Sequence, residues 1–284
     1  MDLCQVHQAL QQPLSALGVR PELGGVRPRF QVQWVEETGS TNQDLMAQMV
    51  QGAAAGTVLL ATAQRQGRGQ WGRQWQSSAG GLYLSLGLRP EIAVSRSRYL
   101  TLASAWGLAA SLRNLGVSVQ VKWPNDLVVA GRKLGGILVD TRTQGDQVSV
   151  AVVGLGLNYR NTVPPTGIAL ASMVNDLPAQ DLPAQGHAAA PHPLTSLEGV
   201  AAVALYGLVQ GYHLWRHWGD SRFLAQYQQG MTHLGQLVVI NHQPGVVVGL
   251  APSGNLIVRL SSGEHGAPRE AEVQPGEVTL GYNA

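Results

Sequence analysis

The residues best suited to chemistry lie in one short stretch, from Gln64 to Trp75, which reads Gln-Arg-Gln-Gly-Arg-Gly-Gln-Trp-Gly-Arg-Gln-Trp. Its glycines allow the backbone to approach a ligand closely, its arginines bind carboxylate or phosphate groups, and its indoles offer a face to a base or a cation. A flexible Arg-Gly tract that binds RNA has the same composition. Apolar strand patterns at 57–63 and 82–88 flank the stretch, however, so we interpret it as a loop held by two buried strands, and therefore as a site.

Two lysines are the next candidates. Lys122 and Lys133 are the only lysines among the 19 basic residues of the chain. Genomic drift from Lys to Arg explains such a bias without any function. A planar guanidinium group nevertheless cannot take the place of a compact ammonium group that acts as a point charge. Two lysines only eleven residues apart therefore indicate positions where arginine would not have the same function.

Neutral hydrogen-bonding groups precede the loop. A strand pattern at 30–36 is followed by Ser40, Thr41 and Asn42, which open a predicted helix, and Gln64 begins the loop itself. Capping of the helix explains Ser40 or Thr41 alone. Consecutive hydroxyl and amide groups at a strand-to-helix turn also lie where ligands bind in α/β folds.

Polar residues also follow the later strand patterns. Asn125 and Asp126 come after the strand 119–123, and Asn158 ends a continuously apolar strand at 148–158. Between them, 127–130 and 133–140 are predicted to form a hairpin in which Gly136 allows a ligand to lie on the backbone. No Ser, His or Cys has the setting of a nucleophile, and there is no Walker A loop. Cations and glycines without a nucleophile favour phosphoanhydride chemistry, in which the protein positions groups and neutralises charge.

The composition is that of a globular protein. The chain has 284 residues, 44% of them hydrophobic, and a net charge of +2, which does not indicate general nucleic-acid binding. We expect no membrane span, no signal peptide and, with one cysteine, no intrachain disulfide. These features predict a cytoplasmic protein.

The pattern along the chain divides it into three parts: an N-terminal extension at 1–29, a catalytic domain at 30–233 and a small β-barrel at 234–284. Helices are expected at 97–115, 195–218 and 219–230, and a low-complexity loop at 176–194, where His187 and His192 are expected in solvent. From Leu234 short strand patterns follow one another. They lie at 236–241, 245–250, 255–260, 269–273 and 277–280. The fold class is therefore α/β (α+β), with a second, all-β part.

Five motifs in order resemble the biotin–protein ligases. They are Ser40-Thr-Asn42, Gly67-Arg-Gly-Gln-Trp-Gly-Arg-Gln-Trp75, Lys122-Trp-Pro-Asn-Asp126, Lys133-Leu-Gly-Gly-Ile-Leu138 and Gly154-Leu-Gly-Leu-Asn158. The chain is similar to the short, monofunctional kind without a DNA-binding domain. The resemblance implies a mixed-sheet catalytic domain like that of class II synthetases, with an SH3-like barrel after it.

The resemblance also implies roles for single residues. Ser40, Thr41, Asn42 and Gln64 would meet the ureido end of biotin. Arg68 and Lys133 would bind its carboxylate and then the adenylate phosphate. Further biotin contacts would come from Gly67, Gly69 and Gly136, and the ATP or adenylate site would comprise Arg68, Gln70, Arg73, Trp75, Lys122, Asn125, Asp126 and Asn158.

The implied reaction has two steps. Biotin and ATP, with Mg²⁺, form biotinoyl-5′-AMP, and a lysine of the biotin carboxyl carrier protein of acetyl-CoA carboxylase then attacks the acyl carbon. Arg68, Lys133 and Asp126 would be catalytic; Asp126 would act as a base towards that lysine or as a ligand on the metal side, and no metal site is assigned firmly. The partners expected are the carrier protein and, in a homodimer, a second copy of the chain, with neither DNA nor a membrane.

One residue departs from the pattern of these ligases. Gln70 stands where the loop usually has a second arginine, and a neutral amide makes weaker hydrogen bonds to phosphate, by ~1–2 kcal/mol. The departure puts closure of the loop over the adenylate in doubt. A lipoate or octanoate ligase or transferase of the same fold is the nearest alternative, although it lacks the Gly-Arg-Gly loop. A non-catalytic Arg-Gly RNA-binding module is an alternative of a different class.

Overall fold

The computed structural model describes residues 1–23, 27–174, 191–261, 269–278 and 280–282. Most of the loop predicted at 176–194, with His187, therefore lies outside the described residues. His192, expected in solvent, is instead half-buried, and its Nδ1 accepts a hydrogen bond from the backbone of Leu194 at 3.3 Å at the start of a 3-10 turn. The prediction for His192 was wrong because a following proline favours such a turn.

Strands form two separate sheets. The larger sheet has eight strands in the order β1-β2-β3-β8-β7-β6-β5, with β4 paired to β8, and the smaller has the order β12-β11-β10-β9. In the larger sheet only β1 and β2 run parallel, so it is a mixed sheet, as predicted. The strands are β1 (Gln31–Thr38), β2 (Thr57–Gln64), β3 (Leu82–Leu88), β4 (Ile92–Ala93), β5 (Gln120–Lys122), β6 (Asp126–Val129), β7 (Arg132–Gln144), β8 (Gln147–Leu157), β9 (Leu237–Ile240), β10 (Gln243–Leu250), β11 (Leu256–Leu260) and β12 (Arg269–Val273).

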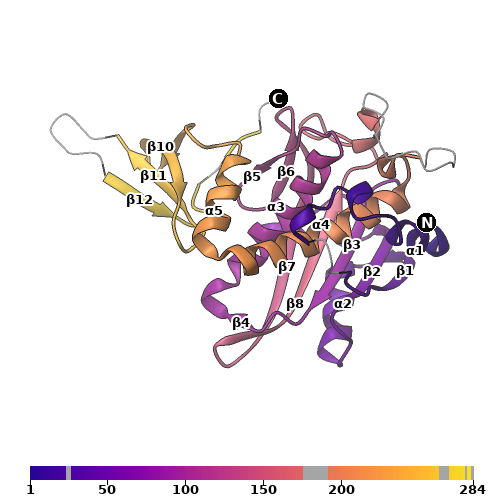
Figure 1. The fold of residues 1–284 in the computed structure, drawn as a ribbon. Helices are drawn as coiled ribbons and strands as arrows, with labels where there is room; N and C mark the ends of the chain where they lie inside the picture. The colour runs from indigo at the N-terminus through magenta and orange to yellow at the C-terminus, as the bar shows by residue number, and fades with distance from the viewer. Residues whose placement is uncertain (24–26, 175–190, 262–268, 279, 283–284) are drawn as a thin grey trace.

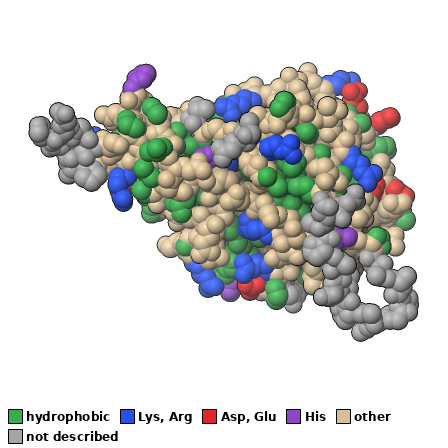
Figure 2. Space-filling model, turned by 90° about the horizontal axis from the view of Figure 1, so that it is seen from above, with side chains coloured by type: hydrophobic (Ala, Val, Ile, Leu, Met, Phe, Trp, Pro, Cys, Tyr) green, Lys and Arg blue, Asp and Glu red, His purple; other side chains and the backbone are tan. Residues whose placement is uncertain are grey.

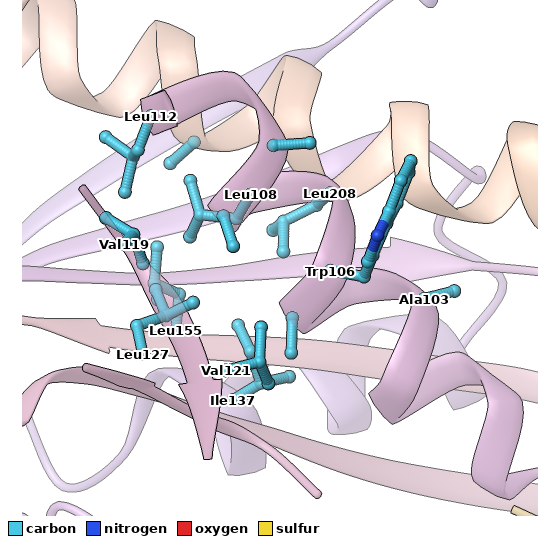
Figure 3. Close-up of a cluster of buried hydrophobic side chains, with 14 of the residues drawn as sticks. Ala103, Trp106, Leu108, Leu112, Val119, Val121, Leu127, Ile137, Leu155 and Leu208 are labelled. Carbon is cyan, nitrogen blue, oxygen red and sulfur yellow. The ribbon is translucent and has the colours of Figure 1, made fainter. Parts of the chain in front are cut away.

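The helices cover both faces of the larger sheet. They are α1 (Leu3–Leu10), α2 (Thr41–Val50), α3 (Arg98–Asn114), α4 (Leu197–Trp218) and α5 (Asp220–Gln229). On one face α2 buries Leu45 and Met49 against Leu59 and Val152. The opposite face carries α3 and α4, whose apolar side chains meet those of β5 to β8 (Figure 3). In β2 and β8 alternating side chains thus belong to different clusters, as the period of a strand requires.

The two central helices approach closely because glycines face each other. A Cβ on Gly107 of α3 would lie 2.3 Å from the carbonyl oxygen of Gly207 of α4, so only glycine fits there. The lack of side chains at these positions therefore allows α3 and α4 to pack closely. None of the helices in the described parts of the chain is long and apolar enough to cross a bilayer.

The chain ends do not form isolated appendages. Val6, Leu10 and Leu17, in the segment expected to be an extension, are fully or almost fully buried in the main hydrophobic cluster. The smaller sheet lies at one end of the molecule beside α5 (Figure 1), and its Val247 and Val258 belong to the same cluster. Apolar side chains from both ends therefore belong to the main hydrophobic cluster.

One predicted strand is replaced by a different structure. Of the strand expected at 277–280, residues 277 and 278 form a bend and 280 has no regular structure, so the smaller sheet has four strands among the described residues. A sheet of four antiparallel strands is what the structure establishes, and closure into a barrel stays a prediction. The segment that follows returns to β5 and β6, where Tyr282 contacts Lys122 and Asp126.

Candidate functional site

Most of the predicted site residues come together in one cavity of about 410 Å³. Its walls are the ends of the larger sheet, the loop between β2 and β3, and the segment from Pro275 to Tyr282. From above, Lys and Arg side chains lie around a group of hydrophobic ones, with Asp and Glu mainly towards the edge (Figure 2). Predicted residues that line the cavity are Ser40, Thr41, Asn42, Gln64, Arg68, Gly69, Gln70, Arg73, Trp75, Lys122, Asn125, Asp126, Lys133 and Gly136.

Two predicted residues do not line it. The Nδ2 of Asn158 donates to the carbonyl of Lys133 at 3.2 Å, so Asn158 braces the strand that carries Lys133. Gly67 is packed tightly, since a Cβ there would lie 2.4 Å from the Ser77 hydroxyl. Both residues contact other parts of the chain that carry site residues. Their proposed contacts with a ligand stay predictions.

One end of the cavity is a neutral hydrogen-bond network. Gln64 Oε1 accepts from the Thr41 backbone at 2.9 Å, while its Nε2 donates to Ser77 at 2.9 Å. The hydroxyl of Ser85, a fully buried residue of β3, lies 2.8 Å from Thr41 Oγ1 and 2.6 Å from Asn42 Oδ1. Ser40 is the N-cap of α2, but its side chain makes no capping hydrogen bond. This end thus holds uncharged donors and acceptors in fixed orientations.

Two glycines of β8 make room for these groups. A Cβ on Gly154 would lie 2.2 Å from Asn42 Oδ1, and one on Gly156 would lie 2.4 Å from Trp75 Nε1. Since Trp75 Nε1 is buried without a partner in the described structure, the indole is held by packing on this bare strand. The glycines in Gly154-Leu-Gly156 are therefore spaces for the side chains of two other motifs.

Charged groups begin next to the neutral end. Arg68 NH1 lies 3.2 Å from Asp140 Oδ2, and the same oxygen accepts from Asn42 Nδ2 at 3.0 Å. Asp140, on β7, was not among the predicted site residues. It joins the neutral end to the first cation of the loop.

The loop is folded on itself and on the C-terminal segment. The backbone N–H of Gly69 donates to Arg73 at 2.7 Å, and that of Trp75 donates to Gly67 at 2.9 Å. Trp71 has a φ of 60°, a region that non-glycine residues rarely adopt. Its ring packs on Gly276, where a Cβ would lie 3.4 Å away. Contact with another part of the chain thus accompanies this unusual backbone.

The far end of the cavity holds both lysines. Lys133 Nζ lies 2.7 Å from Asp126 Oδ1 and 5.1 Å from the centre of the Trp75 ring. Lys122 Nζ lies 3.4 Å from the centre of the Tyr282 ring, and the Tyr282 hydroxyl donates to Asp126 Oδ2. Asn125 also lines this part of the cavity, and its Nδ2 donates to the backbone carbonyl of Ile137 at 2.8 Å.

Burial lowers the pKa of Lys122 to about 8, and the attraction of Asp126 offsets only part of that effect. The nearby charges of Lys133 and Arg73 lower this pKa further. Such a lysine gains much from a new negative charge, because an anion restores the stability of its charged form. The far end of the cavity is therefore suited to a polyanion.

Sequence reasoning missed Tyr282, Ser85 and Asp140. Tyr282 follows strand-like sequence and has no motif around it, and Ser85 looks like any small residue of a buried strand. Asp140 gave a weak signal, as an acidic residue within an apolar hairpin strand. Among the described residues no group of three or more His, Cys, Asp or Glu side chains could hold a metal ion.

Comparison with known proteins finds a match for the part of the chain that holds the predicted site residues. Residues 34–158 match the Biotin/lipoate A/B protein ligase family. The matched region, which is less than half of the chain, contains every predicted site residue, and the resemblance found in the motifs is confirmed for it.

Relatives extend the similarity to other parts of the chain. Over 157 residues the chain is 36% identical to the biotin--[acetyl-CoA-carboxylase] ligase of Mycobacterium tuberculosis, which covers 52% of this chain and 57% of that protein. Over 108 residues it is 36% identical to the bifunctional ligase/repressor BirA of Bacillus subtilis, 37% of this chain and 33% of that protein. The match to the biotin--[acetyl-CoA-carboxylase] ligase of Paracoccus denitrificans is 26% identical and covers 81% of this chain and 95% of that protein. The match to this chain thus spans about a third of the length of the Bacillus subtilis protein and little more than half of the length of the Mycobacterium tuberculosis protein.

The fold has solved counterparts. The biotin protein ligase of Aquifex aeolicus in complex with biotin and ATP has a TM-score of 0.63 and 23% identity, over 89% of this chain and 99% of that one. At this identity the likeness concerns the fold. The predicted fold class, a mixed α/β catalytic fold with a second, all-β part, is confirmed.

Proposed function

We propose that the protein is a biotin–protein ligase that uses ATP to activate biotin and transfers it to a lysine of a carrier protein. The observation that carries the proposal is the order of groups along the cavity. A neutral hydrogen-bond network at one end is followed by Arg68, and Lys122, Lys133 and Trp75 lie at the other end. Biotin has the matching order of a ureido ring and a carboxylate, which must meet a phosphate before transfer.

In the first step the biotin carboxylate attacks the α-phosphate of MgATP, which gives biotinoyl-5′-AMP and pyrophosphate. Thr41, Asn42 and Gln64 bind the ureido ring, while Arg68 and Lys133 neutralise the carboxylate and the phosphate oxygens. Placed charges of this kind lower the barrier because they need no reorganisation as charge develops. Trp75 stacks on the adenine ring, and Lys122 binds the polyphosphate.

In the second step a lysine of a biotin carboxyl carrier protein attacks the acyl carbon, and AMP leaves. A lysine with its reference pKa of ~10.4 is protonated at neutral pH and needs a base. Asp126 is the carboxylate nearest to Lys133, at 2.7 Å. In this structure Asp126 accepts from both Lys133 and Tyr282, so it positions Lys133 and acts as a base only after one of these contacts is released.

Pyrophosphate release tests the first step. Release with ATP should require biotin and should not occur with lipoate or octanoate in its place. Transfer of biotin to the isolated carrier domain of acetyl-CoA carboxylase tests the second step. Lipoate-dependent release without biotin-dependent release would favour the lipoate ligases of the same family, and nucleic-acid binding that falls steeply with salt, without any release, would favour the RNA-binding alternative.

A further inference from the structure

The corner of the cavity that holds both lysines contains a side chain with no role in the proposed reaction. Tyr282 lies 156 positions after Asp126 in the chain, and its hydroxyl donates to Asp126 Oδ2. The centre of its ring is 3.4 Å from Lys122 Nζ and 5.9 Å from Lys133 Nζ. Tyr282 thus contacts both the cation and the carboxylate of this corner.

Tyr282 occupies the ammonium group of Lys122, which the phosphates of a bound nucleotide would also contact. An aromatic face attracts an ammonium group within about 6 Å, but a phosphate makes a shorter, charge-assisted hydrogen bond of about 2.8 Å. With the ring 3.4 Å from Nζ, that side of Lys122 is covered. A phosphate oxygen and the phenol ring therefore compete for the same side of the ammonium group.

The hydroxyl group contributes separately. Burial, the charge of Asp126 and the hydrogen bond to it raise the pKa of Tyr282 well above its ordinary value, so the phenol stays protonated and remains a donor. Asp126 has Lys133 on one oxygen at 2.7 Å and this phenol on the other. Movement of the ring away from Lys122 would remove one of these two contacts.

We infer that Tyr282 is an internal ligand of the phosphate-binding corner, and that the polyphosphate of an incoming nucleotide displaces it from Lys122 and Asp126. This inference rests on the proposed function. Displacement sets the nucleotide affinity of the site, because binding must first break the ring–ammonium and phenol–carboxylate contacts. It also releases one oxygen of Asp126, so that the base of the second step becomes available only when a nucleotide is bound.

The neighbourhood of Tyr282 is consistent with a displaceable segment. Gly281 precedes it and is loosely packed, since a Cβ there would meet no atom within 4 Å. Further upstream Gly276 packs against the ring of Trp71 in the loop between β2 and β3. Movement of Tyr282 is therefore expected to alter the contact between Gly276 and the loop that is proposed to hold the phosphate.

Nucleotide binding to two variants tests the inference. MgATP affinity is measured by calorimetry for the wild type, Tyr282→Phe and Tyr282→Ala, with biotin affinity as the check that each protein is folded. We expect Tyr282→Ala to bind MgATP at least threefold more tightly than the wild type, and Tyr282→Phe, which keeps the ring but lacks the hydroxyl, to lie between them. Unchanged or weaker MgATP binding by Tyr282→Ala overturns the inference alone, whereas no binding of MgATP by any of the three proteins overturns the proposed function as well.

Lysine labelling tests the contact without a substrate. Trinitrobenzenesulfonate modifies amines, and the chain offers only Lys122, Lys133 and the amine of Met1, so each product is identified by peptide mass. Relative to the Met1 amine, Lys122 should react at least threefold faster in Tyr282→Ala than in the wild type or Tyr282→Phe, since both of these keep the ring over Nζ. Equal rates for Lys122 in Tyr282→Ala and the wild type would show that the ring does not cover it, and would overturn the inference.

Discussion

Single residues of the cavity differ in whether another residue can replace them. Lys133 is a point charge 2.7 Å from Asp126, whereas Arg68 is a planar group beside Asp140. A guanidinium group is wider than an ammonium group and spreads its charge over several donors. An arginine at position 133 would therefore place its charge and donors differently beside Asp126.

Lys133→Arg is expected to slow pyrophosphate release by at least ~30-fold, or ~2 kcal/mol of barrier, on the scale of one misplaced charge stabiliser. The neighbouring Arg132 is exposed, so Arg132→Lys is a control that makes a similar change outside the cavity. Single-turnover release of pyrophosphate measures both. A Lys133→Arg rate within twofold of the control would remove Lys133 from the reaction.

Lys122 predicts a proton linked to nucleotide binding. With a pKa of about 8, its side chain is largely neutral at pH 8.8 and charged at pH 6.8. A bound polyphosphate favours the charged form and raises this pKa, so binding should take up a proton at pH 8.8, and affinity should fall as the pH rises through 8. Calorimetry in two buffers of different ionisation enthalpy gives the uptake. Lys122→Arg, charged at both pH values, should lose it, and the same uptake in that variant would assign the proton elsewhere.

At the scale of elements, β8 serves two motifs by lacking side chains. Gly154 faces Asn42 of α2, and Gly156 faces Trp75 of the loop. A strand buried on both faces tolerates glycine poorly, because glycine adds no packing. Its presence at two alternating positions therefore indicates that the space is used by another element.

Paired substitutions in β8 should separate the two ends of the cavity. Gly156→Ala pushes against Trp75 and is expected to weaken MgATP binding at least tenfold, or ~1.4 kcal/mol, with little effect on biotin. Gly154→Ala pushes against Asn42 and should weaken biotin binding in the same way, with MgATP little affected. Calorimetric titration of both variants with both ligands measures this. Equal losses of both ligands in the two variants would indicate a general disturbance of β8.

At the scale of the whole molecule, the smaller sheet packs against the rest of the chain through hydrogen bonds and shared apolar contacts. The indole N–H of Trp123 donates to Gly254 at 2.9 Å, and the Tyr99 hydroxyl donates to Pro252 at 2.6 Å. Apolar residues of both sheets form one cluster. The segment after the smaller sheet then completes a wall of the cavity.

We therefore expect the two sheets to unfold together. Differential scanning calorimetry of the full chain should give one transition, because removal of the smaller sheet would expose apolar surface of α3 and β5 to water. A chain cut after residue 233 should lack a folded state with the same thermal stability. Two well-separated transitions, with the first assigned to 234–284 by limited proteolysis, would show that this part folds independently.

The sequence by itself determined the strands around the loop, the order of the motifs and the types of groups in the cavity. The predicted strand 82–88 coincides with β3, and helix α3 lies within the predicted 97–115, because their patterns depend on neighbours in sequence. Short motifs such as Lys122–Asp126 and Lys133–Leu138 carry their chemistry in the same local way.

Only the tertiary structure decided which motifs touch. Gly156 makes room for Trp75, Ser85 binds Thr41 and Asn42, and Tyr282 meets Asp126 across 156 positions of the chain. No local pattern predicts such pairs, because a long-range contact depends on how whole strands are ordered in the sheet rather than on the residues beside it. The bend at 277–278, where a strand was expected from 277 to 280, has the same origin: Val278 lines the cavity, and a local preference favours a strand there only weakly.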